Sequence, residues 1–203
     1  MRNLSTRVII GLLTFLVGVA AAAACYLGLP GANQEVRLII PEASWEPSLF
    51  RHINPVVSRS GQVELRKANL PKGDVELRVW WGFGLSPLQG ITLRRVSGHW
   101  SAIHVRADEE HESGRVERKE LSPPESGWEA CWQRLLGAGV LTLPDASEAD
   151  CGEGGLDGVS FVVETNADRT YRTFKYSNPT IAECDEAKQM VKITGIIGEE
   201  FRW

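Results

Sequence analysis

The feature that most constrains the fold is a series of short segments in which apolar and charged residues alternate. Residues 62–67 ("QVELRK") and 74–81 ("DVELRVWW") place every second side chain on one face, which predicts half-buried β-strands. Residues 91–96 and 99–105 follow as two more strands, separated by the tight-turn pair Ser97-Gly98. Because strands joined by tight turns pair antiparallel, the pattern predicts a sheet built from hairpins.

A further hairpin is expected near the C-terminal end, with its tip at Ala167-Asp168. This tip pairs residue 163 with 172 and gives the hairpin one core face, made of Val159, Phe161, Val163, Phe174 and Tyr176. The other face is expected to be more polar and holds Ser160, Val162, Glu164, Tyr171, Thr173 and Lys175. One face of an antiparallel sheet often meets water, so this polar face predicts either a solvated surface or a ligand site.

Two helices are expected to follow strands in the chain. Ser126 and Glu129 have the spacing of a capping box, and Thr180 and Glu183 repeat it. The apolar stripes that follow are Trp128, Cys131, Trp132, Leu135 and Leu136 in the first helix, and Met190, Ile193, Ile197 and Phe201 in the second. The predicted fold class is therefore α+β, an antiparallel β-sheet of hairpins with two helices packed on one face.

The first thirty residues predict export. Arg2 and Arg7 precede an uncharged segment of 22 residues, Val8 to Leu29, with no acidic residue nearby. This is the pattern of a signal peptide, and the segment also exceeds the roughly 20 residues that a membrane anchor helix needs. A third alternative is lipidation at Cys25, which follows a run of alanines, although such motifs usually have leucine where Ala22 stands. We therefore expect a signal peptide or membrane anchor over residues 1–30 and a single exported globular domain over 31–203.

The composition of the exported part limits its partners. Its 173 residues suffice for one domain with a real core. Its formal charge is −6, since Arg2 and Arg7 are removed from a chain of net charge −4. An acidic body disfavours nucleic-acid binding and electrostatic docking on anionic lipid. We expect membrane contact through the N-terminal segment only, in a membrane-anchored or periplasmic location.

Three cysteines lie outside the N-terminal segment. Cys131 falls on the apolar stripe of a predicted helix, where a free thiol behaves as a small hydrophobe. Cys151 and Cys184 lie in a loop and at a helix start, so we predict a disulfide between them, worth about 3–4 kcal/mol by chain entropy. No Cys-x-x-Cys pair or suitably spaced His–Cys set suggests a metal, and none is expected.

The glycine-rich stretch 78–95, "RVWWGFGLSPLQGITLRR", raises the question of a phosphate loop. Such a loop opens a helix, whereas a predicted strand follows here, and the third glycine is misplaced. A wide hairpin turn is therefore expected, and no cofactor. Trp80 and Trp81 are adjacent on a strand and point to opposite faces, so one is exposed unless both faces are covered. Trp80, Trp81 and Phe83 are the candidate binding residues, because exposed tryptophans dominate interfaces.

Catalytic patterns are missing from the sequence. It contains neither Gly-x-Ser-x-Gly nor Ser-x-x-Lys. His99 and His104 are five residues apart on one predicted strand, so they point to opposite faces and cannot ligate one metal. If the chain is an enzyme, the residues best placed for a site are Glu164, Tyr171 and Lys175 on the polar hairpin face. Catalytic residues are otherwise not predicted.

Four stretches resemble uncharacterised exported bacterial proteins: "LRVWWGFGLSPLQGITLRRVSGHWSA", "LLGAGVLTLPDAS", "LDGVSFVVE" and "YRTFKYSNP". That family has no assigned activity, so the resemblance implies a bacterial envelope setting and no mechanism. We expect a non-enzymatic cell-envelope domain that binds a protein or an envelope component, of which an inhibitor or immunity-type protein would be one version. The alternative is an envelope hydrolase at Glu164, Tyr171 and Lys175.

Overall fold

The structure, a computed structural model, describes residues 35–83, 86–108, 114–149, 151 and 158–202. The hydrophobic segment 1–30 and Cys25 lie outside these residues, so its role as signal peptide, anchor or lipidation signal remains a prediction. None of the helices in the described ranges combines the length and the apolar character needed to cross a membrane. The chain from Val36 onward forms one compact unit.

A seven-stranded sheet in the order β1-β7-β6-β2-β3-β4-β5 organises this unit. The strands are β1 Arg37–Ile39, β2 Val75–Trp81, β3 Gln89–Val96, β4 His99–Ala107, β5 Val116–Glu120, β6 Ser160–Ala167 and β7 Thr170–Ser177. Neighbours pair antiparallel except β1, which runs parallel to β7. The sheet is therefore mixed, and a purely antiparallel sheet was the wrong prediction, because the three residues of β1 are too few to show a period.

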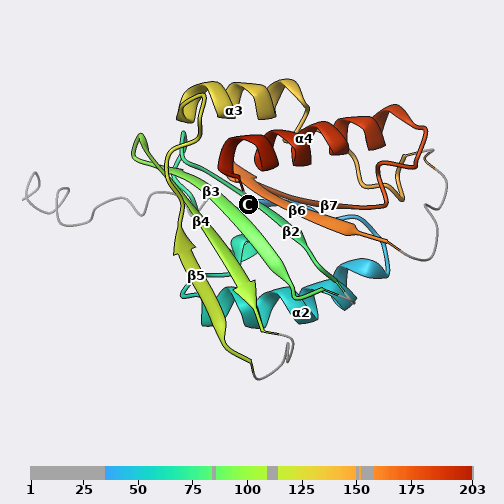
Figure 1. Cartoon of the computed structure of the whole chain (residues 1–203), viewed down its shortest axis with the longest axis horizontal. Helices are drawn as coiled ribbons and strands as arrows, with labels where there is room; N and C mark the ends of the chain where they lie inside the picture. Colours follow the sequence, from blue (N-terminus) through green and yellow to red (C-terminus); the bar gives the residue numbers. More distant parts are fainter. Residues whose placement is uncertain (1–34, 84–85, 109–113, 150, 152–157, 203) are drawn as a thin grey trace, which may run out of the picture. The chain divides into compact units, whose positions relative to one another are not determined.

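Among the described residues, three helices cover this sheet on both faces: α2 Trp45–Arg59, α3 Trp128–Gly137 and α4 Asp185–Phe201. Figure 1 shows α3 and α4 on one side of the sheet and α2 on the other. The α+β class is confirmed, as are α3 and α4, but the prediction that helices cover only one face is wrong. The sequence around α2 looks irregular because it contains Pro47 and Pro55. Pro47 lies in the first turn, where amides lack helical partners anyway, and Pro55 is tolerated inside the helix.

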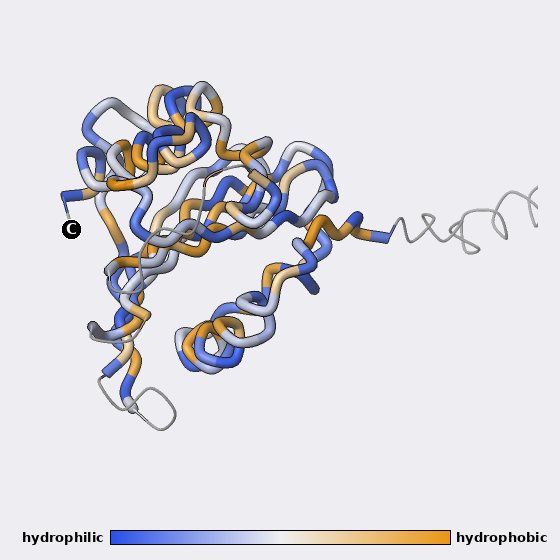
Figure 2. The backbone as a smooth tube through the Cα atoms, turned by 90° about the vertical axis from the view of Figure 1, so that its right-hand side faces the viewer, coloured by the Kyte–Doolittle hydropathy of each residue, from blue (hydrophilic) through white to orange (hydrophobic). Residues whose placement is uncertain are grey.

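Each face of the sheet has its own hydrophobic cluster. On the α3/α4 face, alternate strand residues such as Leu77, Val79 and Phe174 pack against both helices. On the α2 face, the helix residues Phe50, Ile53, Val56 and Val57 pack against strand residues that include Trp80, Ile103 and Val105. The tube in Figure 2, coloured by hydropathy, shows α2 as a separate layer beside the sheet. Both faces of the central strand β2 are consequently buried along its whole length.

An irregular segment connects α2 to β2 across the α2 face. It contains the short 3-10 helix η1, Leu65–Lys67, where the alternation of residues 62–67 had predicted a strand. That prediction is wrong, since Leu65 alone of the three is fully buried and no neighbouring strand is available for pairing. We call residues 60–70 the cover segment.

The β6–β7 hairpin has the predicted faces but a different register. Val163 lies opposite Phe174, not opposite residue 172. The turn is formed by Asp168 and Arg169, which both have positive φ (48° and 62°), the twist that two-residue hairpins favour. Because the pairing is offset by two residues, an even number, each side chain keeps the face predicted for it.

The predicted disulfide between Cys151 and Cys184 is confirmed, and Cys131 is a buried free thiol. Glu186 lies close to both bridged sulfurs. The sulfurs are bonded to each other, however, and offer a metal no thiolate. Cys184 is also the N-cap of α4, where its Sγ accepts a hydrogen bond from the amide of Ala187 at 3.3 Å. The helix therefore begins later than the capping-box spacing from Thr180 predicted.

The capping box predicted from Ser126 and Glu129 does not form at the start of α3. Gly127 is the N-cap, and the amide and hydroxyl of Ser126 both donate to the carboxylate of Glu200 in α4, at 2.9 and 2.7 Å. Arg134 also pairs with Glu200. Burial alone would raise the pKa of Glu200, but the hydrogen bonds from Ser126 and Arg134 outweigh it and hold that pKa below its ordinary value.

Candidate functional site

The predicted binding residues Trp80, Trp81 and Phe83 belong to the interior. Trp80 is 0 % exposed and Trp81 7 % exposed, and Phe83 packs against the α2 cluster. The expectation that one tryptophan is exposed is therefore wrong, because α2 covers the second face. Gly90 lies directly opposite Trp80, and a Cβ there would come within 2.3 Å of the indole ring. Trp80 and Trp81 therefore stabilise the fold, whereas Phe83 is half-buried.

The two histidines of β4 lie on opposite faces, as their spacing predicted. His104 stacks on Trp81 with a ring-centroid distance of 5.9 Å. Burial lowers the pKa of His104, which favours its neutral form. His99 lies at the other end of the strand beside the β3–β4 turn, so the fold does not bring the two rings together.

The polar hairpin face does contain a perturbed carboxylate. Glu164 accepts a hydrogen bond from Trp80 Nε1 at its Oε2 (2.8 Å) and one from the Tyr171 hydroxyl at its Oε1 (3.1 Å). Burial raises the pKa of Glu164, although the nearby Arg78 and both hydrogen bonds favour ionisation. The pKa of Tyr171 is raised as well, first by burial and then by the charge of Glu164.

This pair is closed to solvent. Glu164 is 2 % and Tyr171 0 % exposed, and Arg66 lies across the ring of Phe50 at 4.2 Å and near that of Tyr171 at 5.9 Å. Lys175 shares their sheet face, and its backbone amide donates to Asp145 at 2.7 Å. A substrate would have to displace the layer above the sheet to reach Glu164, so the arrangement acts as part of the core.

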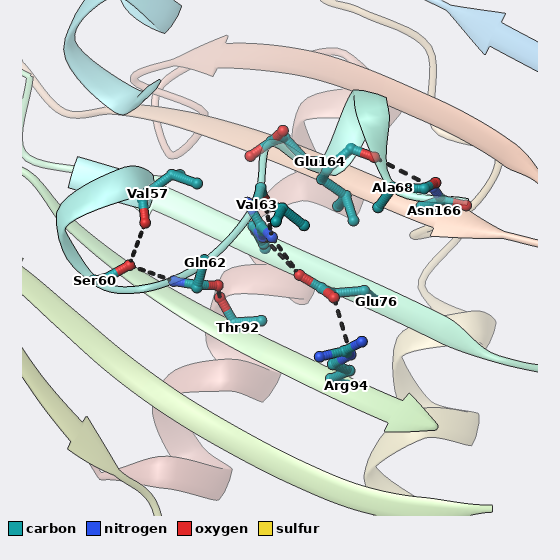
Figure 3. A network of polar contacts seen from close by, with 12 residues as sticks. Val57, Ser60, Gln62, Val63, Ala68, Glu76, Thr92, Arg94, Glu164 and Asn166 are labelled. Carbon is teal, nitrogen blue, oxygen red and sulfur yellow. Dashed lines mark hydrogen bonds and ion pairs between the residues drawn. The ribbon is translucent and has the colours of Figure 1, made fainter. Parts of the chain in front are cut away.

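Two polar residues of this face, Arg78 and Asn166, donate hydrogen bonds to backbone carbonyls of the cover segment. Arg78 Nη2 donates to the carbonyl of Val63 at 2.8 Å. Asn166 Nδ2 donates to the carbonyls of Leu65 and Ala68 at 3.2 and 2.8 Å (Figure 3 shows Asn166 and Ala68). An irregular segment cannot satisfy its own buried carbonyls, so the sheet beneath must supply donors. The burial of Arg78 and Asn166 is explained in this way.

A groove of about 330 Å³ opens between the cover segment and strands β2 to β5. Its lining includes Val63, Leu70, Glu76, Arg78, Arg94 and Arg118. Glu76 Oε1 accepts from Arg78 Nε and Nη2 at 2.8 and 2.5 Å, and Glu76 Oε2 lies 3.2 Å from Arg94 Nε (Figure 3 shows Glu76 and Arg94). We call this site the arginine groove.

The arginine groove holds more positive charge than its own residues neutralise. Three guanidinium groups and one carboxylate line it, a formal charge of +2 in an acidic body. Arg78 is only 1 % exposed, and its Nη1 is buried without a hydrogen-bond partner among the described residues. The Arg94 side chain is 48 % exposed, and Arg118 is exposed. A guanidinium group carries five N–H donors and matches the geometry of a carboxylate or phosphate.

Sequence reasoning missed the arginine groove. Glu76 and Arg78 alternate with apolar residues, which suggested a strand with one solvated face. A usable signal was the position of Trp80, which continues the same face as Glu76 and Arg78. A tryptophan on the same strand face as two charged residues indicates that a second layer covers this face.

Compared with models of known protein families and with curated proteins, the sequence matches none. The features that bear on function are therefore the geometry of the arginine groove and the Cys151–Cys184 disulfide.

Proposed function

We propose that the chain is an exported, non-enzymatic binding domain that receives an acidic group, a carboxylate or a phosphate, in the arginine groove. The observation that carries this proposal is the Nη1 of Arg78, a buried nitrogen without an acceptor among the described residues, on a side chain that lines the groove. A buried donor left without a partner costs about 1–3 kcal/mol. A ligand oxygen on the groove floor would remove this cost.

The chemistry of the groove favours an anion. Guanidinium groups bind carboxylate and phosphate oxygens through paired, charge-assisted hydrogen bonds. Arg94 and Arg118 are exposed and would contact the ligand at the groove entrance. Glu76 neutralises Arg94 and Arg118 only in part, because its Oε1 already accepts hydrogen bonds from two nitrogens of Arg78.

The burial of Glu164 and Tyr171 supports a binding domain over the alternative hydrolase. A general acid or base has to come within hydrogen-bond reach of its substrate. Both residues are covered by the layer that contains Phe50 and Arg66, and Lys175 lies outside their hydrogen-bonded cluster. The raised pKa of Glu164 follows from burial in the core and requires no catalytic role.

An envelope location is part of the proposal. The Cys151–Cys184 disulfide is the kind of bond that persists in oxidising compartments, and the sequence of residues 1–30 predicts export. We therefore propose a protein or an envelope component as the natural partner. Nucleic acid is excluded from the proposal by the charge of −6 on the body.

Titration of the isotope-labelled domain with inorganic phosphate and with acetate tests the anion site. Amide resonances of Arg94, Ser101 and Arg118 are expected to shift saturably in nuclear magnetic resonance spectra. Replacing Arg94 and Arg118 together by Gln should weaken binding at least about tenfold, equivalent to about 1.4 kcal/mol. Arg106→Gln removes one positive charge, half the change made in the double variant, from the opposite face and serves as the control. Unchanged affinity in the double variant, or shifts spread over both faces, would contradict the proposal.

A further inference from the structure

The arginine groove has two chemically different ends. Its floor carries the Arg78 guanidinium, while its wall includes Val63, Leu70 and Ile103. Val63 is 67 % exposed, one of the large apolar side chains that the described surface leaves open to water. Its carbonyl accepts a hydrogen bond from Arg78 Nη2, so the apolar wall and the charged floor are in direct contact. A ligand matched to both ends carries an acidic group next to an apolar side chain.

The volume of the groove limits the ligand to a small group. About 330 Å³ is near the lower end of the range for small-molecule sites, which begins at roughly 300 Å³. A folded partner cannot enter such a space, but the last residues of an extended chain can. The entrance residues Arg94, Ser101 and Arg118 are exposed, so the rest of the chain would leave over strands β3 to β5.

The charge of the groove distinguishes a chain end from a free amino acid. A free amino acid carries an ammonium group beside its carboxylate, and that group would meet the guanidiniums of Arg78 and Arg94. Glu76 cannot compensate, since both of its oxygens already contact arginine nitrogens. A peptide bond in place of the ammonium removes the repulsion, because the amide is neutral.

We propose that the arginine groove recognises the C-terminal carboxylate of a peptide whose last side chain is apolar. The carboxylate lies on the floor against Arg78 and Arg94, and the last side chain packs on Val63 and Leu70. This inference rests on the proposed anion site and names its ligand class. Capture of a C-terminal carboxylate is an established mode of peptide recognition, in which other domains use backbone amides.

Probes that differ by one group test the inference. We would measure the affinity of acetyl-Ala-Ala-Val with a free carboxylate, the same peptide with a C-terminal amide, acetyl-Ala-Ala-Gly with a free carboxylate, and inorganic phosphate. The free acid ending in Val is expected to bind at least about tenfold more tightly than its amide. It should also bind at least about threefold more tightly than the acid ending in Gly, which lacks apolar contact area.

Two substitutions locate the two ends of the ligand. Arg94→Gln should weaken both free acids by a similar factor. Val63→Ser should weaken the peptide ending in Val by about threefold and leave the peptide ending in Gly unchanged. Val159→Ser, at another exposed valine (50 %), is the matched control and should change neither affinity. All three sites are exposed on the surface, and thermal unfolding of each variant confirms that it is folded.

The outcomes separate this inference from the proposed function. Equal affinity for the free acid and its amide overturns the inference. Binding of phosphate without binding of either free acid overturns it too, and leaves the anion site standing. If neither phosphate nor any free acid binds, both the inference and the proposed function are wrong. Loss of selectivity for Val over Gly in Val63→Ser supports the placement of the side chain.

Discussion

The two faces of the sheet differ in what covers them, and the difference explains where the polar residues lie. On the α3/α4 face, β2 presents Leu77 and Val79 to two helices. On the other face the same strand presents Glu76 and Arg78 to the irregular cover segment, and Trp80 to helix α2. Helices satisfy their own backbone groups and need an apolar surface beneath them. An irregular cover needs donors, and the sheet supplies them from Arg78 and Asn166.

This comparison also shows why the candidate site lies where it does. Arg78 donates from Nη2 to the carbonyl of Val63, and from both Nε and Nη2 to Glu76 Oε1. Its Nη1 has no hydrogen-bond acceptor among the described residues. The surplus donor occurs at the boundary where the cover segment gives way to solvent. A binding site can form there without a dedicated cleft, because the fold already places a charged group beneath a partial cover.

The largest expected effect tests the apolar face. Phe174→Ala removes a fully buried ring from the α3/α4 cluster and should lower the free energy of unfolding by about 3–5 kcal/mol. The neighbouring Thr173→Val removes a buried hydrogen bond to the carbonyl of Val163 on the polar face and should cost about 0.5–1.5 kcal/mol. Urea unfolding of both variants measures the difference. Comparable losses at both positions would mean that the faces do not differ as described.

A smaller effect is expected at the junction between α2 and the sheet. Gly90→Ala places a methyl group against the Trp80 ring, where the Cβ would come within 2.3 Å. Overpacking of this kind costs about 1–3 kcal/mol. Gly98→Ala is the comparison: an added Cβ there has nothing within 4 Å, so any loss of stability comes from the positive φ of residue 98 and not from overpacking. If the near-ultraviolet circular dichroism of Gly90→Ala matched that of the original protein, with equal stability, the tight contact would be disproved.

The smallest effect is a difference in pH dependence between two buried carboxylates. The pKa of Glu164 is raised, so its contribution to stability is full below its ordinary pKa and is lost as the pH rises. The pKa of Glu200 is lowered, so its contribution is present above its ordinary pKa and is lost as the pH falls. As the pH rises above about 4, the stability gap to the original protein should therefore narrow for Glu164→Gln. For Glu200→Gln the gap should widen as the pH rises from about 2 to about 5.

Denaturant unfolding at several pH values measures both gaps under the same conditions. The opposite sign of the two slopes is the expected result, and it does not depend on the absolute loss in either variant. Two slopes of the same sign would show that one of the two carboxylates lies in a different environment.

Much of the local structure followed from the sequence, but the layer on the second face did not. The alternation in β2, the Ser97-Gly98 turn, the apolar stripes of α3 and α4 and the Cys151–Cys184 bridge were readable because each depends on neighbouring residues or on simple chemistry. Helix α2 was hidden by its prolines. Without α2, the charges of β2 looked solvated and one tryptophan looked exposed.

The arginine groove was unpredictable for a related reason. Arg78, Arg94 and Arg118 come from three strands, and their approach depends on strand order, which the spacing of residues does not reveal. The register of β6–β7 was missed by two residues because non-glycine residues, Asp168 and Arg169, occupy the turn. Local patterns predict elements well and predict the contacts between distant elements poorly.

The edge strand β5 has a consequence for the solution behaviour of the protein. Asp108 donates to the carbonyl of Arg115, and Leu121 to that of Ala102, so the backbone groups of residues 116, 118 and 120 point away from the sheet. An open edge invites a second copy to add its own β5. Any antiparallel pairing about a two-fold axis at Glu117, Arg118 or Lys119 sets that residue opposite itself, like charge against like. Pairing about Arg118, however, also sets Glu117 of each copy opposite Lys119 of the other, so the charges of β5 still permit pairing of two copies.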